Sequence, residues 1–340
     1  MGLRFLSAFL NERLPAMLGM ERVAGSKGRR ARQVGTSLGE VTLHRAYVPG
    51  GGCPLDEALG LVDGFTPEAA SMLCVAGSMS ESYDKGEGSL KKLSGLSVPG
   101  RAIQRLVNDV SPQMEADVSF RQTLGSDGKP AVEKSSIGHL VAFEDKERFG
   151  ERLFRWQTGR GLREGMTHVV TADGAPWIWD LVDTVFPRAV QIVDFFHAGE
   201  HLMELCRLQC PGKDGKAAEE RFGMRRRMLK AHGAASLIRY FEEHGPQSPN
   251  AAAIDERLNY FRVNERRMRY GEFRRKGYVI GSGAVEGACR SVINQRADLS
   301  GQRWHPDGAL NELRIRGMVM DGIHEDYWKR RGTVRRLEVA

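Results

Sequence analysis

Three carboxylate residues in two distant segments of the chain have the types and positions that a divalent-metal site needs. Asp173 and Asp194 each end an apolar run rich in β-branched residues, which is typical of a buried strand. Glu286 follows the turn Gly281–Gly283 at the start of a predicted helix. Carboxylates at strand ends, joined by a glutamate from a distant helix, can hold metal ions for phosphoryl transfer. The sequence therefore predicts one site built from these three residues.

Each signal also has a simpler structural interpretation. An aspartate at a strand end more often caps a helix or stabilises a turn, and Gly-Ser-Gly before a helix is a common cap. His197 and His201 have the spacing of metal ligands on a helix, although two hydrogen-bonded helix residues are the commoner outcome. Trp177, Trp179 and Trp304 are expected in the core, with a role in gripping DNA as the minority interpretation.

The balance of charges favours a polyanionic partner. The chain has 340 residues, 41% of them hydrophobic and 27% charged, with a formal net charge of +7. Nucleic acid is the natural phosphodiester for such a basic chain, although charge alone does not identify it. No apolar run approaches the roughly 20 residues that a membrane-spanning helix needs. Five cysteines without a CxxC pair give weak support to a zinc site and fit a reducing cytoplasm.

The first 112 residues predict a strand pair followed by three helices. Residues 1–60 read as an opening amphipathic helix and two strands, with alternating polarity from Val41 to Val48. Thr66 and Pro67 are residue types that cap and begin a helix. A second helix is expected over about Ser80–Leu93 and a third over Arg101–Val110, after a glycine-bearing turn.

This third helix is the candidate DNA-reading element, because three short helices with such a turn resemble a helix-turn-helix unit. Ile103, Leu106 and Val107 are expected on its inner face. Its exposed face would carry Arg101, Gln104 and Arg105. A plain helical bundle with a solvated basic face is the alternative.

From residue 136 onward the pattern predicts alternating strands and helices. Strands are expected at Ser136–Asp145, in THVVTAD and in AVQIVDFF, separated by helices at Lys146–Gly159 and in APWIWDLVDTVF. This β-α-β-α-β order favours an α/β layer with a parallel portion. Residues 198–275 are predicted to be helical and carry the densest charge, with five arginines as further candidates for DNA contact: Arg225, Arg226, Arg227, Arg266 and Arg267. Gly283–Met320 is again predicted helical, with a break at Gly301–Pro306.

Four motifs of the chain resemble the core of bacterial insertion-sequence transposases of the Kra type. They are DGAPWIWDL, FPRAVQIVDFFHAGEHL, YFRVNERRMRYGEFRRKGYVIGSGAVEGACRSVINQR and SGQRWHPDGALNELRIR. The resemblance runs in order from Asp173 to Trp328 and extends more weakly upstream. It implies an α/β fold with an RNase H-like core, a helical insertion and a preceding helix-turn-helix-like DNA-binding region. It also implies a DDE triad that uses Mg²⁺ or Mn²⁺.

Specific roles follow from this resemblance. Asp173 would be the second aspartate of the triad and Glu286 the catalytic glutamate, both of them metal ligands. Asp194 and His197 would support the site. Arg290, one helical turn after Glu286, would contact a DNA phosphate or structure the site. The implied partners are DNA, as element ends and target, and further copies of the chain in a homo-oligomer on DNA. A cytoplasmic, nucleoid-associated protein without membrane contact is expected.

The first aspartate of the triad has several candidates. Asp127, before Gly128 and Pro130, is the leading one, as a catalytic residue and metal ligand, but no convincing apolar strand precedes it. Asp117 and Asp145 are rivals. Asp145 has the better strand before it but lies close to Asp173 in sequence, with little room for intervening strands.

The sequence leaves three functions open and predicts five segments. Besides a DDE transposase, the chain is compatible with a non-catalytic DNA-binding descendant of one, or with an RNase H-like metal-dependent nuclease. The segments are an N-terminal helix and strand pair, a helical DNA-binding region, the first part of the core, a helical insertion, and a C-terminal catalytic helix with a tail. Their boundaries are residues 1–60, 61–112, 113–200, 201–276 and 277–340.

Overall fold

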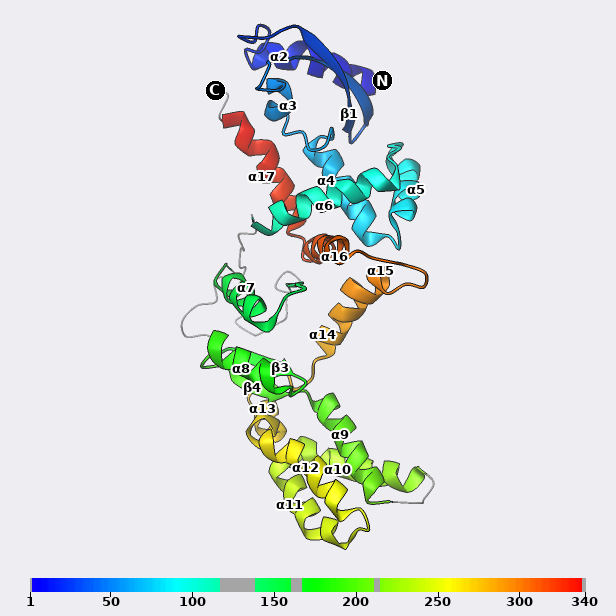
Figure 1. Cartoon of the computed structure of the whole chain (residues 1–340), viewed down its shortest axis with the longest axis vertical. Helices are drawn as coiled ribbons and strands as arrows, with labels where there is room; N and C mark the ends of the chain where they lie inside the picture. The colour runs from blue at the N-terminus through cyan, green and yellow to red at the C-terminus, as the bar shows by residue number, and fades with distance from the viewer. Residues whose placement is uncertain (1, 117–137, 160–166, 211–214, 338–340) are drawn as a thin grey trace. The chain divides into compact units, whose positions relative to one another are not determined.

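The computed structural model describes residues 2–116, 138–159, 167–210 and 215–337, which are mostly helical with two small sheets of two strands each (Figure 1). The chain divides into two compact units. The first unit combines Met1–Phe143 with Ala288–Ala340 and includes Gly159–Gly161. The second combines Glu144–Thr158 with Leu162–Gly287. The second unit is therefore inserted within the sequence of the first.

The first unit begins with the predicted helix and strand pair, drawn in blue in Figure 1. Helix α1 (Gly2–Ala8), the π-helical segment η1 (Phe9–Arg13) and α2 (Leu14–Met17) precede an antiparallel hairpin of β1 (Arg29–Thr36) and β2 (Gly39–Ala46). Alternate residues of the hairpin, Val34, Val41 and Leu43, are buried together with Leu10 of η1. The period-two polarity of this segment thus gives the hairpin one buried face.

Three helices follow the short helix α3 (Pro54–Ala58), as the sequence predicts. They are α4 (Pro67–Met79), α5 (Tyr83–Ser94) and α6 (Gly100–Ala116). The Thr66 hydroxyl caps α4 by accepting a hydrogen bond from the Ala69 N–H, at 3.4 Å. The predicted end of the third helix at Val110 is wrong. The helix continues through Pro112 because its apolar stripe extends to the buried Met114.

The far end of the chain completes the core of these three helices. Helix α16 (Pro306–Met320) and helix α17 (His324–Leu337) contribute Ile315, Tyr327 and Trp328 to the hydrophobic cluster of α4, α5 and α6. The break predicted around Gly301–Pro306 is present, since α15 (Gln295–Ala297) ends before it and α16 begins after it. Helices α4, α5 and α6 therefore do not form an independent bundle.

A buried ion pair fastens these C-terminal helices to α4 and α5. The Arg296 Nε atom lies 2.8 Å from Glu312 Oε1, and both side chains are almost fully buried. The Tyr83 hydroxyl donates to Glu312 Oε2 at 2.7 Å. Arg296 is held between the rings of Tyr83 and Trp304, each 4.7 Å from its guanidinium carbon. The buried charges of Arg296 and Glu312 thus pair with each other, as burial of ions requires.

The second unit contains the predicted parallel strands. Helix α7 (Lys146–Gly159) leads to β3 (Val169–Ala172), α8 (Pro176–Val185) and β4 (Val190–Val193), and β3 pairs with β4 in parallel register. Helix α7 has the bounds that its sequence predicts. The parallel portion of the α/β layer is confirmed, with α8 as the crossover helix.

The strand predicted at Ser136–Asp145 is wrong over its described part, residues 138–145. This segment follows helix α16 instead of a neighbouring strand. The His139 N–H donates to Asp321 Oδ2 at 2.8 Å, and the His139 ring bonds the other oxygen of the same carboxylate. Since its hydrogen bonds run to side chains, the segment has no ladder partner.

Five helices follow β4 and are drawn in green to yellow in Figure 1. They are α9 (Phe195–Leu208), α10 (Lys216–His232), α11 (Ala234–His244), α12 (Ala251–Val263) and α13 (Tyr270–Arg275). The helical character predicted for residues 198–275 is confirmed over the described part of this range. These helices share one hydrophobic cluster with β4 and α8, in which Ile192, Phe241 and Phe261 meet. In the part of the chain that the structure describes, none of the helices is both long and apolar enough to cross a bilayer.

Candidate functional site

The parallel pairing of β3 and β4 brings two of the predicted carboxylate residues to one edge of the sheet. Ala172 and Val193 are partners in the register, so that Asp173 and Asp194 follow at the same level. The Asp194 N–H donates to the Ala172 carbonyl at 2.7 Å. The carboxyl ends of parallel strands thus place these residues side by side.

The Asp194 carboxylate is a structural clamp. Its Oδ1 atom accepts a hydrogen bond from the His197 N–H at 2.7 Å, which caps helix α9. Its Oδ2 atom accepts from the Ser282 N–H, 88 residues further along the chain. Only 2% of Asp194 is exposed. Both oxygens therefore have backbone donors, and the residue joins β4, α9 and the turn before Glu286.

The segment before Glu286 lies along the ends of both strands. The Thr171 hydroxyl donates to the Val279 carbonyl at 3.3 Å, and the Phe195 N–H donates to the Ile280 carbonyl at 2.9 Å. A Cβ atom on Gly281 would lie 2.9 Å from the ring of Phe196. A side chain at this position would have to displace the ring of Phe196, which favours glycine.

Glu286 lies in the first turn of the helix that follows this segment. Helix α14 (Gly283–Ala288) continues through the π-helical segment η5 (Cys289–Asn294) into α15. The side chain of Glu286 is exposed, and its carboxylate makes no hydrogen bond or ion pair with another described residue. The clamp at Asp194 therefore leads, within one helical turn, to an unengaged carboxylate.

Asp173 occupies a tight turn at the end of β3. Its Oδ1 atom accepts from the Ala175 N–H at 3.0 Å, and Gly174 has a φ of +96°. The Tyr260 hydroxyl, from helix α12, donates to the Asp173 carbonyl at 3.0 Å. Asp173 is exposed, and its Oδ2 atom makes no bond with another described residue. The aspartate thus presents one carboxylate oxygen to an incoming ligand.

Two histidines and a tyrosine pack beside this edge. The rings of His201 and Tyr260 are stacked at 3.8 Å, and His197 lies edge-on to His201 at 5.1 Å. Burial and then the charge of His197 lower the pKa of His201. Burial raises the pKa of Tyr260, and the negative charges of Asp173 and Asp194 add to this effect. His201 is therefore neutral at pH 7, and Tyr260 is a hydrogen-bond donor.

The described residues fit a metal ion only in part. Among them, no three His, Cys, Asp or Glu side chains form a group that could hold a metal. Asp127 and Asp117, two candidates for the first aspartate, lie outside the described residues. Asp145, the third candidate, caps helix α7, since its Oδ1 atom accepts from the Arg148 N–H at 2.8 Å. Among the described residues, Asp173 and Glu286 therefore remain candidate ligands, and no third carboxylate forms a metal-binding group with them.

The predicted basic face of α6 is exposed. Ile103, Leu106 and Val107 are fully buried, as expected for the inner face. The outer positions are those of the polar residues Arg101, Gln104 and Arg105. Arg105 forms an ion pair with Asp63, at 2.7 Å, which occupies part of its guanidinium.

The five candidate arginines of the helical block, which runs from α9 to α13, fall into two groups. Arg225 lies over the ring of Tyr240 at 3.3 Å, Arg226 over Phe195 at 5.2 Å and Arg267 over Trp179 at 4.7 Å. These three pack on aromatic rings. Two others are exposed, Arg227 and Arg266.

Arg266 and Arg267 line a groove of about 590 Å³, together with Arg262, Arg269 and the first residues of β4. Arg262 and Arg269 are paired with carboxylates, those of Glu242 and Glu272 among others. This groove lies at the amino end of β4, whereas Asp173 and Asp194 lie at the carboxyl ends of the strands. Its positive charge is therefore separate from the carboxylate edge, which is the edge of the sheet that bears Asp173 and Asp194.

The two remaining DNA-binding candidates differ in exposure. Arg290 is exposed on η5. Trp304 is half-buried, covers the buried Arg296, and donates from Nε1 to the Gln302 side chain at 3.1 Å. Trp304 thus contributes to the packing of the first unit.

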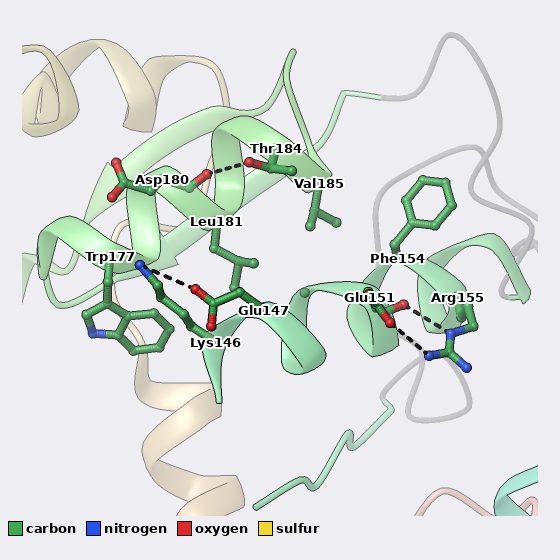
Figure 2. A pocket seen from close by; sticks show the side chains of 11 residues that line it. Lys146, Glu147, Glu151, Phe154, Arg155, Trp177, Asp180, Leu181, Thr184 and Val185 are labelled. Carbon is green, nitrogen blue, oxygen red and sulfur yellow. Dashed lines mark hydrogen bonds and ion pairs between the residues drawn. The ribbon is translucent and has the colours of Figure 1, made fainter. Parts of the chain in front are cut away.

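An apolar groove lies between α7 and α8 (Figure 2). It has a volume of about 650 Å³, and Phe154, Trp177 and Leu181 are among its lining residues. Four of its charged residues form two ion pairs, Lys146 with Glu147 at 3.7 Å and Glu151 with Arg155 at 3.6 Å. Neither Asp173 nor Glu286 lines it.

Two contacts of the site were not foreseen from the sequence. Tyr260 lies within a charged stretch, where only its position beside the buried Leu258 and Phe261 indicates a helix face turned toward the core. The Ser282 N–H is a backbone donor and carries no side-chain signal.

A comparison with the models of known protein families finds no match for this chain, and a search among curated proteins finds no related sequence.

Proposed function

We propose that this chain is a DDE transposase that cleaves DNA ends and joins them to target DNA, with part of an RNase H-like core formed by β3, α8, β4 and α14. The observation that carries the proposal is the convergence at one sheet edge of Asp173, Asp194 and the turn that leads to Glu286. The resemblance of the motifs around these residues to Kra-type transposases supports it.

The proposal assigns Asp173 and Glu286 to Mg²⁺ or Mn²⁺. Both carboxylates are exposed and have oxygens without partners among the described residues, which suits hard divalent cations. When bound, such an ion would neutralise charge at the phosphodiester undergoing transfer. Asp194 would act through its two backbone hydrogen bonds, by holding the glutamate helix at the end of β4.

DNA is the proposed partner, as both element ends and target. The net charge of +7 and the exposed Arg101, Gln104, Arg227, Arg266 and Arg290 support this assignment. By the same resemblance, the protein would act as a homo-oligomer on DNA in the bacterial cytoplasm.

A strand-transfer assay tests the proposal. DNA ends that flank the gene are incubated with the full chain and Mg²⁺ or Mn²⁺, and joined products are measured. We expect Asp173→Ala and Glu286→Gln each to lower product formation by at least about 100-fold. Asp180→Asn, at an exposed carboxylate of α8, is the matched control and should retain activity. Strand transfer that survives Glu286→Gln sinks the proposal.

The same assay, run with Asp127→Ala and Asp145→Ala, identifies the first carboxylate. Loss of product with Asp127→Ala alone would assign this role to Asp127. Cleavage without joined product would instead favour a nuclease that uses the same carboxylates.

A non-catalytic DNA-binding protein is the second candidate. The observation that favours it is the lack of a third carboxylate among the described residues. It predicts DNA binding that weakens steeply with salt. It also predicts that no metal-dependent product forms, whichever carboxylate is replaced.

A further inference from the structure

We propose that Tyr260 is a positioning residue that fixes the Asp173 turn from the helical block, a role that rests on the proposed function of the carboxylate edge. Tyr260 belongs to α12, 87 residues after Asp173 in sequence. Its hydroxyl is the contact by which this helix holds the backbone carbonyl of the aspartate.

The turn at Asp173 is shaped around the tyrosine hydroxyl. A Cβ atom on Gly174 would lie 2.9 Å from the Tyr260 oxygen, and the φ of +96° is one that side-chain-bearing residues rarely adopt. The hydroxyl donates to the Asp173 carbonyl at 3.0 Å. The hydroxyl is the donor in this bond, because a backbone carbonyl can only accept.

The tyrosine ring is itself held in place. It stacks on His201 of α9 at 3.8 Å, with an angle of 21° between the planes, and it lies edge-on to Phe261 at 5.4 Å. Helix α9 begins at Asp194, whose carboxylate caps it. Tyr260 thus connects the turn of Asp173 to the helix that starts at Asp194. The relative position of the two aspartates is fixed by this connection as well as by the sheet.

This arrangement leaves the aspartate oriented for a ligand. One carboxylate oxygen accepts from the Ala175 N–H and the carbonyl accepts from Tyr260, so that both ends of the residue are restrained. The remaining oxygen points to neither partner. Loss of the hydroxyl would free the turn without removing any candidate ligand, and it would lower the rate of a step that depends on ligand orientation.

Tyr260→Phe tests the proposal, with Tyr240→Phe as the matched control. Tyr240 lies in the same helical block and is also stacked on a histidine, His244, at 4.4 Å. Its hydroxyl bonds to no other described residue. Both variants keep their rings, and thermal melts confirm that each remains folded. Amide exchange of the peptide spanning residues 172–178 and strand-transfer kinetics are then measured for the full chain.

We expect Tyr260→Phe to speed exchange in this peptide and to lower kcat, each by about 5-fold, the equivalent of one hydrogen bond. The KM for DNA should stay unchanged, and Tyr240→Phe should resemble the wild type in both measurements. Unchanged exchange in Tyr260→Phe overturns the positioning role, and so does faster exchange with an unchanged kcat. A wild type that forms no metal-dependent product, with exchange still faster in Tyr260→Phe, overturns the proposed function alone and leaves the hold on the turn in place.

Discussion

At the scale of single residues, Asp173 and Asp194 carry the same side chain in different environments. Asp194 is buried with both oxygens bonded to backbone N–H groups, whereas Asp173 is exposed with one oxygen that bonds no other described residue. Position separates them, because burial and a backbone donor on each oxygen keep Asp194 from outside ligands, whereas Asp173 is exposed. Their replacement should therefore affect different properties, stability for Asp194 and activity for Asp173.

Asp194→Asn should lower the free energy of unfolding of the second unit by about 1.5–3 kcal/mol. The amide NH2 would face either the His197 or the Ser282 N–H, which loses its acceptor, and the other N–H would keep only a neutral one. Urea unfolding of the full chain measures the change. Asp180→Asn, which alters an exposed carboxylate in the same unit, should leave the midpoint within error. Equal midpoints for the two variants would contradict the clamp.

The stability of the second unit should decrease as the pH falls below about 6.5. Burial lowers the pKa of His201 from its ordinary value of 6.5, and the charge of His197 adds to this shift, with partial opposition from Glu204 and Glu200. The unfolded chain therefore takes up a proton before the folded chain does. The stability conferred by neutral His201 is complete above 6.5 and is lost as the pH falls toward the folded value.

Thermal melts between pH 5 and pH 8 check this dependence. His201→Phe keeps an aromatic ring against Tyr260 but cannot be protonated, so its melting temperature should vary less over the same range. If this variant retained the whole dependence, other groups would be responsible for it.

At the scale of elements, two neighbouring arginines of one 3₁₀ segment, η4 (Glu265–Met268), have different environments. Arg267 lies on the Trp179 ring and donates from Nε to the Gln191 side chain at 2.7 Å. Arg266 is exposed on the same groove. The segment therefore packs Arg267 against the Trp179 ring and leaves its neighbour Arg266 exposed to solvent.

Arg266→Ala should weaken DNA binding and reduce the salt dependence of log K by about 1, without loss of stability. Arg267→Ala should instead destabilise the second unit by about 1–2 kcal/mol, because stacking and hydrogen bonding are lost together. Binding measured at several salt concentrations, beside melts of both variants, separates the two effects. If Arg266→Ala bound DNA with an unaltered salt slope, this groove would not be a phosphate contact.

At the scale of the whole molecule, each unit has its own core, and a buried ion pair joins distant parts of the first. The Arg296–Glu312 pair and its Tyr83 partner link α15 and α16 to helices near the start of the chain. Arg296→Ala should destabilise the first unit by about 3–5 kcal/mol, because Glu312 would be left buried without its cation. Calorimetry should show a lowered transition for that unit only. Arg303→Ala, at an exposed arginine in the loop before α16, should leave both transitions unchanged.

Local signals predicted much of this fold, and long-range contacts account for the rest. Thr66 and Pro67 mark the start of α4, and the β-branched runs before Asp173 and Asp194 mark parallel strands, because caps and strand polarity depend on neighbouring residues. The strand predicted at Ser136–Asp145 failed because a strand also needs a partner, and His139 bonds the Asp321 side chain instead.

The candidate site was predictable to the same extent. Its carboxylates lie at the ends of elements whose positions the sequence indicates. The residues that hold these carboxylates in place have no such signal in the sequence. Tyr260 reaches Asp173 across 87 positions, and Ser282 reaches Asp194 across 88. Such pairs depend on how helices pack, which a single sequence does not specify.

Because the sequence of the second unit lies within that of the first, the second unit is synthesised completely before the first. All of the second unit has left the ribosome once residue 287 has emerged, so it can fold while the chain is still growing. Helices α4, α5 and α6, made earlier, must wait for Ile315, Tyr327 and Trp328 to complete their core. At roughly 5–20 residues per second, the delay after α6 is on the order of 10–40 s. During that time, chaperones would bind a nascent chain in which the second unit has folded and helices α4, α5 and α6 still expose apolar surface.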